Sequence, residues 1–137
     1  MDKKPKHLEF IQGVINRLST NSFLLKGWSV VLVSALFALA ASDSRASFVY
    51  LAYIPAIVFW GLDGYFLWQE RLYRALYDQV RVSDEAGIDF SMDTSSFKGG
   101  PGRTWGEAVL SRTLVSFHGV LILAIFVVMM LTRTTGR

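Results

Sequence analysis

The chain has 137 residues, enough for one compact unit and too few for two domains with separate hydrophobic cores. Hydrophobic residues make up 52% of the chain and charged residues only 18%, which argues against disordered proteins and ordinary soluble scaffolds. Because there is no cysteine, disulfides, thiolate catalysis, cysteine-ligated zinc and iron–sulfur clusters are excluded. The net charge of +3 is a mild basic excess whose distribution indicates a membrane rather than duplex nucleic acid.

The first segment, residues 1–22, has the pattern of an amphipathic helix. Apolar side chains fill one half of its helical wheel and polar side chains fill the other half. Three lysines precede the pattern: Lys3, Lys4 and Lys6. We predict a helix that lies flat in the inner membrane interface. A helix packed on other cytoplasmic elements is the equally weighted alternative.

Three apolar stretches follow that are long enough to cross a bilayer. The first, residues 23–41, spans about 28 Å as a helix, and its only charge, Lys26, can snorkel to the headgroups from near one end. We expect this span to be retained, because the segment before it is too long for the basic n-region of a signal peptide. The second span covers residues 46–67 and the third lies within residues 104–132. The sequence therefore predicts an all-α integral membrane protein, a single domain over residues 1–137 with three transmembrane helices.

The distribution of basic residues predicts the orientation of these spans. Lysines and arginines cluster before the first span and between the second and third spans: Lys3, Lys4, Lys6, Arg17, Lys26, Arg71, Arg74, Arg81, Lys98, Arg103 and Arg112. The opposite side carries only Arg45, Arg133 and Arg137. The positive-inside rule then places the N-terminus and the middle segment in the cytoplasm and the C-terminus outside. The tryptophans agree, because this topology gathers them at the cytoplasmic interface: Trp28, Trp60, Trp68 and Trp105.

The second span is expected to continue as a cytoplasmic helix as far as residue 82. Oppositely charged residues recur along one side at spacings of three and four, which suits ion pairs within a helix. The other side is apolar and includes Leu72, Leu76 and Val80. Because the chain offers little else to cover this side, we predict that these three residues pack against a second copy. Pro55 predicts a bend in the second span.

Residues 83–103 are predicted to form a cytoplasmic loop, with a short strand around residues 88–92. Lys98 and Arg103 flank a glycine-rich run just before a helix start, where amides and cations could hold a phosphate, so both are candidate signal-binding residues. A flexible turn is the plainer alternative for this run. The spacing of Thr104 and Glu107 fits a capping box, so the third helix is predicted to begin there.

One face of the third helix carries a segregated stripe of side chains. The polar half comes first, the apolar half follows, and the six residues are Glu107, Ser111, His118, Ile122, Ile125 and Met129. This order is typical of a pore-lining helix with a hydrophobic constriction, so we predict that the stripe lines a pore. The alternative, given equal weight, is that His118 bonds a neighbouring helix. Asp63 is a candidate for a cytoplasmic vestibule, or for pairing with Lys26 or Arg112.

No catalytic constellation is present in the sequence. The two histidines, His7 and His118, lie far apart, and there is no zinc-protease helix or P-loop. We therefore expect no enzyme, no metal site and no cofactor.

Four short segments resemble a known group of proteins. They are residues 6–12 (KHLEFIQ), 21–28 (NSFLLKGW), 71–78 (RLYRALYD) and 89–92 (DFSM). Together they resemble small multi-span bacterial membrane proteins encoded in antiphage defence loci beside signalling or sensing partners. The resemblance implies an inner-membrane effector of antiviral defence, an oligomeric channel that depolarises the infected cell when a cytoplasmic signal changes. Its expected partners are a nucleotide-type signal or a soluble defence protein.

Two functions from different classes follow from these observations. The first is a homo-oligomeric ion channel or pore-forming effector in the lipid bilayer, gated by a cytoplasmic signal. The alternative is a non-conducting membrane anchor or regulatory subunit that docks a soluble partner at the inner leaflet. A transporter that uses Asp63 and His118 is weaker, because the chain shows no internal repeat.

Overall fold

A computed structural model describes residues 2–43 and 45–136 and shows an all-α fold, which confirms the predicted class. In chain order the helices are α1 (Lys3–Asp43), α2 (Ser47–Leu51), α3 (Tyr53–Val82), the 3-10 turns η1 (Glu85–Gly87) and η2 (Ser95–Phe97), α4 (Trp105–Val109) and α5 (Arg112–Thr135). Three helical segments, α1, α2 with α3, and α5, are long and apolar enough to cross a membrane by length and composition. Three candidate spans were predicted, and their presence suggests a membrane location.

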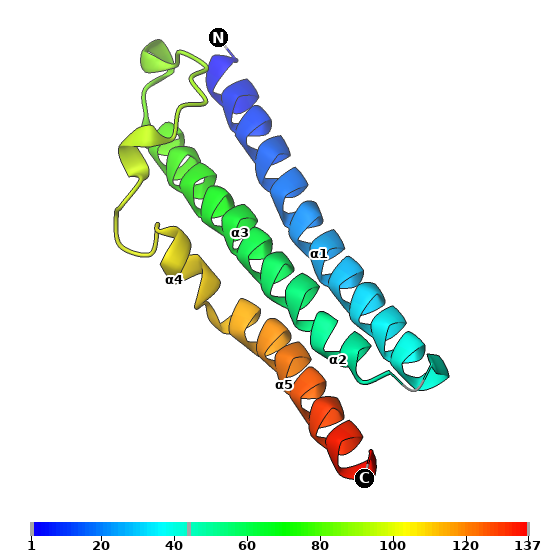
Figure 1. Cartoon of the computed structure of the whole chain (residues 1–137). Helices are drawn as coiled ribbons and strands as arrows, with labels where there is room; N and C mark the ends of the chain where they lie inside the picture. The colour runs from blue at the N-terminus through cyan, green and yellow to red at the C-terminus, as the bar shows by residue number, and fades with distance from the viewer. Residues whose placement is uncertain (1, 44, 137) are drawn as a thin grey trace.

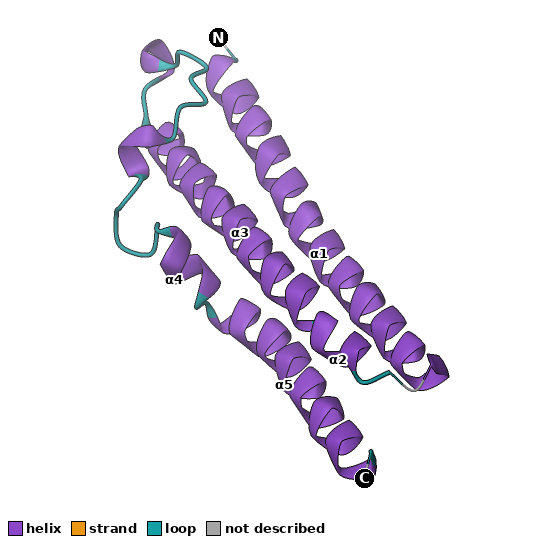
Figure 2. Ribbon diagram, in the orientation of Figure 1, coloured by secondary structure: helices purple, strands orange, loops and turns teal. Residues whose placement is uncertain are grey.

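The long helices lie side by side, with α3 between α1 and α5 (Figure 1). The N-terminus and the loop after α3 are at one end of the molecule, and the C-terminus is at the other (Figure 1). Colouring by secondary structure shows that irregular chain is concentrated between α3 and α4 (Figure 2). Within the ranges that the structure describes there is no strand, so the strand expected around residues 88–92 is absent.

The predicted amphipathic segment is not a separate interfacial helix, because α1 runs unbroken from Lys3 to Asp43. Its fully buried residues are His7, Ile11, Ile15, Ser29 and Val33. At about 100° per residue these five positions fall within about 100° of one another, so one stripe continues from the amphipathic segment into the first span. This stripe packs along α3, and the alternative of a helix packed on other elements is the one that the structure shows.

The end of the molecule that holds the loop has its own apolar core, and we call residues 3–18, 72–82 and 83–103 the head. The buried residues of this core are Ile11, Ile15, Leu76, Val80 and Ile88. The Glu85 carboxylate joins the loop to the start of α1, because it accepts hydrogen bonds from the backbone N–H groups of Lys3 at 2.6 Å and Lys4 at 3.2 Å. An acidic group at a helix N-terminus satisfies donors that have no partner within the helix.

This core corrects the prediction for Leu72, Leu76 and Val80. All three side chains are buried within a single chain, with exposed fractions of 0%, 4% and 5%. The expectation that a second copy must cover them was wrong, because all three are buried within one chain. Leu76 and Val80 pack with Ile11 and Ile15 of the amphipathic segment, which was expected to lie on the membrane. The three residues present no apolar surface to another copy.

A second core joins the helices at the opposite end. Its buried residues are Val33, Val49, Ala52, Ala56 and Ile125. The small side chains at Ala52 and Ala56 suit close approach of helix backbones where lipid supplies no hydrophobic drive. The helix is interrupted between α2 and α3 at Ala52, three residues before Pro55, because proline lacks the N–H that would bond the carbonyl of Leu51. The bend predicted near Pro55 corresponds to this interruption.

The third predicted helix is divided into α4 and α5. The Thr104 hydroxyl accepts a hydrogen bond from the Glu107 N–H, so the predicted helix start is confirmed. A new helix then begins at Arg112, where the Ser111 hydroxyl accepts from the Leu114 N–H. Serine competes for backbone donors in this way and favours caps over helix interiors, which explains why a single helix over residues 104–132 was the wrong expectation.

Two tryptophans hold α4 against α3. The Trp105 Nε1–H donates to the Gly61 carbonyl at 3.0 Å, and the Trp60 Nε1–H donates to the Val109 carbonyl at 3.0 Å. The backbone of α4 also approaches Gly64 so closely that a Cβ there would overlap the Val109 side chain and lie 3.3 Å from its Cα. Glycine at this position is therefore a packing requirement.

Substituting Gly64→Ala is expected to lower the free energy of unfolding by about 1–3 kcal/mol, because α4 must move away from α3. Gly61→Ala is the matched control on the same helix, since its Cβ would lie 3.7 Å from the Trp105 ring, an ordinary contact. The control should be neutral or stabilising by up to about 1 kcal/mol. Unfolding by SDS in mixed micelles measures both, and equal stability of the two variants would contradict this account.

Candidate functional site

A cluster of ionisable side chains is buried where α1, α3 and α5 meet. Lys26 comes from α1, Asp63 from α3 and His118 from α5, so each long helix contributes one group. Asp63 and His118 are 0% exposed, and the Lys26 side chain is 18% exposed. Charged and ionisable groups are rare inside membrane-spanning segments and mark functional sites there by default.

The Asp63 carboxylate is the centre of this cluster. Its Oδ2 atom accepts from the Lys26 ammonium at 2.5 Å and from the His118 Nε2–H at 2.8 Å. Its Oδ1 atom accepts from the Ser22 hydroxyl, and the Lys26 ammonium also donates to the Ser22 Oγ at 2.9 Å. The negative charge is thus matched by one cation and two further donors, which a buried charge needs to be tolerated.

The imidazole of His118 is fixed in its plane by neighbouring rings. It stacks on Trp60, with ring centroids 5.8 Å apart and planes within 8° of each other, and Phe117 meets it edge-on at 5.1 Å. Because Nε2 donates to the carboxylate, Nδ1 faces the interior, and it has no hydrogen-bond partner among the described residues. A buried orphan nitrogen is costly, so this geometry is maintained by the surrounding packing.

Chemically, the arrangement is an ionic lock across three helices. Asp63 on α3 accepts from Ser22 and Lys26 on α1 and from His118 on α5, so separating α1 from α3 would strand a buried charge. Such a cluster favours one packing of the helices over others by several kcal/mol, and it is a physical basis for a two-state switch. Within the described ranges no group of three or more His, Cys, Asp or Glu could hold a metal ion.

The six stripe residues occupy different environments from those expected of a pore lining. Glu107 is exposed on α4, and Ser111 is the cap of α5. His118 and Ile125 are 0% exposed, facing Asp63 and the second core respectively, while Ile122 and Met129 are half-buried beside that core. The part of the stripe from His118 onward therefore packs within its own chain, and the alternative in which His118 bonds a neighbouring helix is the one observed.

The structure also places the remaining candidates. Asp63 pairs with Lys26, one of the two partners considered, instead of lying open in a vestibule. The Lys98 ammonium lies 5.8 Å from the centre of the Trp68 ring. The Arg103 guanidinium donates to the Phe97 carbonyl at 3.0 Å, so it holds the loop together. Neither cation lines the polar pocket between His7 and Ser96.

Sequence reasoning missed two members of the cluster, Ser22 and Trp60. Ser22 lies four residues before Lys26, which puts both on one face of α1. Trp60 lies three residues before Asp63, and the same rule puts them on one face of α3. The sequence therefore shows that each pair shares a helix face, but it does not show which faces of different helices pack together.

Comparisons with known proteins add nothing to this geometry. No protein-family model, no curated protein sequence and no solved structure matches the chain.

Proposed function

We propose that the protein is a membrane effector of bacterial antiphage defence that conducts ions as a homo-oligomer when a cytoplasmic signal acts on its head. The observation that carries the proposal is the buried cluster of Lys26, Asp63 and His118, which ties the three candidate spans together at one level. Burying ionisable side chains inside a membrane costs free energy, and a helix that serves only as an anchor has no need of them. The cluster acts as the lock of the closed state.

An inner-membrane location with a cytoplasmic head fits the charge distribution. The head contains most of the basic residues, whereas Arg45 follows α1 and Arg133 lies in the last turn of α5, at the end away from the head. Arg133 donates to the Tyr50 hydroxyl at 2.9 Å, an arrangement suited to a membrane interface. The positive-inside rule then makes the N-terminus cytoplasmic and the C-terminus periplasmic.

Assembly of several copies supports conduction, because three helices cannot enclose an aqueous path. Apolar side chains on the outer faces of α1 and α5 are available to lipid or to further copies: Phe23, Val31, Val120 and Leu123. We propose that opening moves α1 relative to α3 and α5, which breaks the Lys26–Asp63 pair and turns Asp63 and His118 toward a path between copies. In that state the polar half of the stripe lines the path, as the sequence predicted.

Ion flux from liposomes containing purified protein tests the proposal. Lys26→Met keeps the apolar stem but removes the cation of the lock, so flux without any signal should rise severalfold over the wild type. Arg17→Met is the matched control, because it removes an exposed cation from the same helix. Flux that stays at the level of empty liposomes in all three preparations would reject conduction.

One observation favours the alternative of a non-conducting anchor that docks a soluble defence protein. The charge of Asp63 is paired within one chain, so the fold does not require a second copy to bury it. The mass of the purified protein in detergent separates the two functions. A ring of identical chains supports the channel, whereas a monomer that is captured only by a soluble partner supports the anchor.

A further inference from the structure

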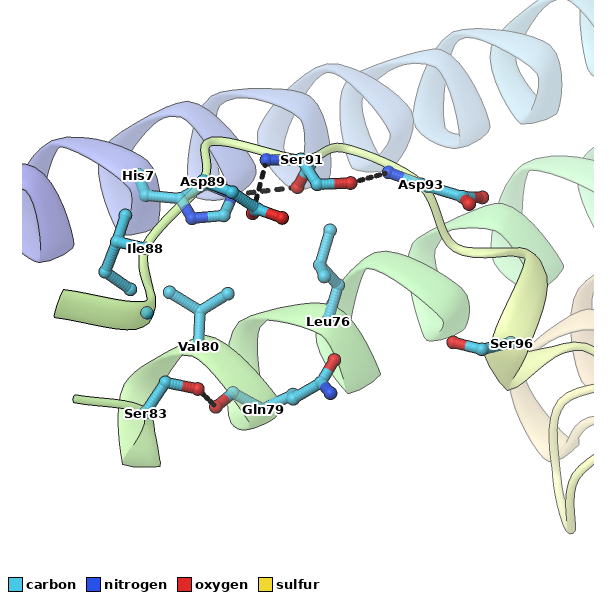
Figure 3. A pocket seen from close by; sticks show the side chains of 11 residues that line it. His7, Leu76, Gln79, Val80, Ser83, Ile88, Asp89, Ser91, Asp93 and Ser96 are labelled. Atoms are coloured by element: carbon cyan, nitrogen blue, oxygen red, sulfur yellow. Dashed lines mark hydrogen bonds between the residues drawn. The ribbon is translucent and has the colours of Figure 1, made fainter. Parts of the chain in front are cut away.

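The head contains a partly open polar pocket that the sequence did not indicate. It lies between the N-terminal part of α1, the C-terminal end of α3 and the loop, and its volume is about 280 Å³ (Figure 3). The floor is apolar, formed by Leu76, Val80 and Ile88. The polar lining consists of His7, Gln79, Ser83, Asp89, Ser91, Asp93 and Ser96. A volume near the lower end of the range for small-molecule sites suits a small metabolite.

His7 is the unusual group of this pocket, because it is 1% exposed and only one of its two ring nitrogens has a hydrogen-bond partner. Its Nε2–H donates to the Ser91 carbonyl at 2.8 Å, since a carbonyl can only accept (Figure 3). In the neutral imidazole Nδ1 is then an acceptor, and it has no partner among the described residues. A buried acceptor of this kind favours a ligand that brings an N–H group.

Two aspartates of the loop add negative charge to the same pocket. Asp89 accepts the Ser91 N–H at 3.0 Å and Asp93 accepts the Ser95 N–H at 2.9 Å, in each case through Oδ1 (Figure 3 shows the first). These turns leave the second oxygen of each carboxylate available to a ligand. The hydrogen bonds from Ser95 also lower the pKa of the Asp93 carboxyl below its ordinary value, so this group is ionised at neutral pH.

The lining contains two carboxylates and no lysine or arginine, so the pocket favours a positively charged ligand. Two carboxylates and an imidazole acceptor above an apolar floor would repel a phosphate and would attract a cation with several N–H donors. We propose that the pocket binds a small organic cation, a primary ammonium or guanidinium on a short hydrocarbon chain. Assigning this cation as the signal rests on the proposed function, whereas its binding does not.

The position of the pocket connects it to the ionic lock. Its walls come from α1 and α3, the helices that also carry Lys26 and Asp63. A cation held between His7 on α1 and the loop after α3 favours one relative position of these two helices. Any difference in affinity between two helix arrangements shifts their populations by the same factor.

Titration calorimetry of the full-length protein in detergent, with putrescine and agmatine as probes, tests this site. We expect both to bind, and inorganic phosphate to give no binding. Asp89→Asn and Asp93→Asn retain the Oδ1 acceptor of each turn but remove the charge, so each should weaken binding about fivefold. Asp84→Asn, an equal change of charge on an exposed residue outside the lining, is the matched control and should leave affinity unchanged.

A second variant addresses the imidazole. His7→Gln can still donate to the Ser91 carbonyl, but its amide oxygen does not occupy the position of Nδ1, so it should fold with wild-type helicity and bind both amines more weakly. The proposal is overturned if neither amine binds at millimolar concentration, if phosphate or Ca²⁺ alone binds instead, or if Asp84→Asn weakens binding as much as Asp89→Asn. A protein that conducts without binding either amine contradicts this site alone, and one that binds without conducting contradicts only the channel.

Discussion

Asp63→Asn is expected to lower the free energy of unfolding by about 3–5 kcal/mol. The carboxylate is fully buried and accepts from Lys26 and His118 on two other helices. Without its charge the Lys26 ammonium has no anionic partner, and the cost of burying a cation is no longer offset. Unfolding by SDS in mixed micelles measures the loss.

A double-mutant cycle separates this ion pair from a general effect of substitution. Lys26→Met removes the cation, so adding Asp63→Asn to it should cost much less than Asp63→Asn costs alone. The expected coupling between the two positions is about 1.5–3 kcal/mol. Arg17→Met combined with Asp63→Asn is the control pair and should be additive, because Arg17 is exposed on α1. An additive Lys26–Asp63 cycle would show that the two groups do not stabilise each other.

Local features of the fold were predictable because their causes are local. Length and uninterrupted hydropathy indicated three spans, and three candidate spans are present. The capping residue Thr104 and the helix breaker Pro55 also act within a few residues of themselves, and both predicted irregularities appear in the structure. The break before Arg112 was missed, because a serine inside an apolar run is compatible with either a continuing helix or a new cap.

Packing between helices was much less predictable, since it depends on which faces meet. The stripe on α5 was recognised as one face, but the sequence does not say whether that face meets a pore or α3. Likewise, Lys26 was considered as a snorkelling residue and as a partner of Asp63, and only the meeting of α1 with α3 decides between them. The pocket around His7 was beyond prediction, because it is formed by a loop without regular structure folding over two helices.

Leu76→Ala is the other substitution with a large expected effect, a loss of about 2–5 kcal/mol in the free energy of unfolding. Leu76 is 4% exposed and packs in the core of the head with Ile11 and Ile15 of α1. The loss combines the transfer free energy of the deleted methyl groups with the cavity left between α1 and α3. Val82→Ala, at a residue 75% exposed on the same helix, is the control and should change stability by no more than about 0.5 kcal/mol.

The dependence of this loss on protein concentration shows which surface covers Leu76. Because α1 of the same chain packs on it, the destabilisation should be equal at two protein concentrations that differ tenfold. If a second copy covered this face, unfolding would be coupled to dissociation, and the wild-type midpoint would rise with concentration while the variant lost that dependence. Such a result would restore the oligomeric role first assigned to Leu72, Leu76 and Val80, and it would require α1 to leave α3 when copies assemble.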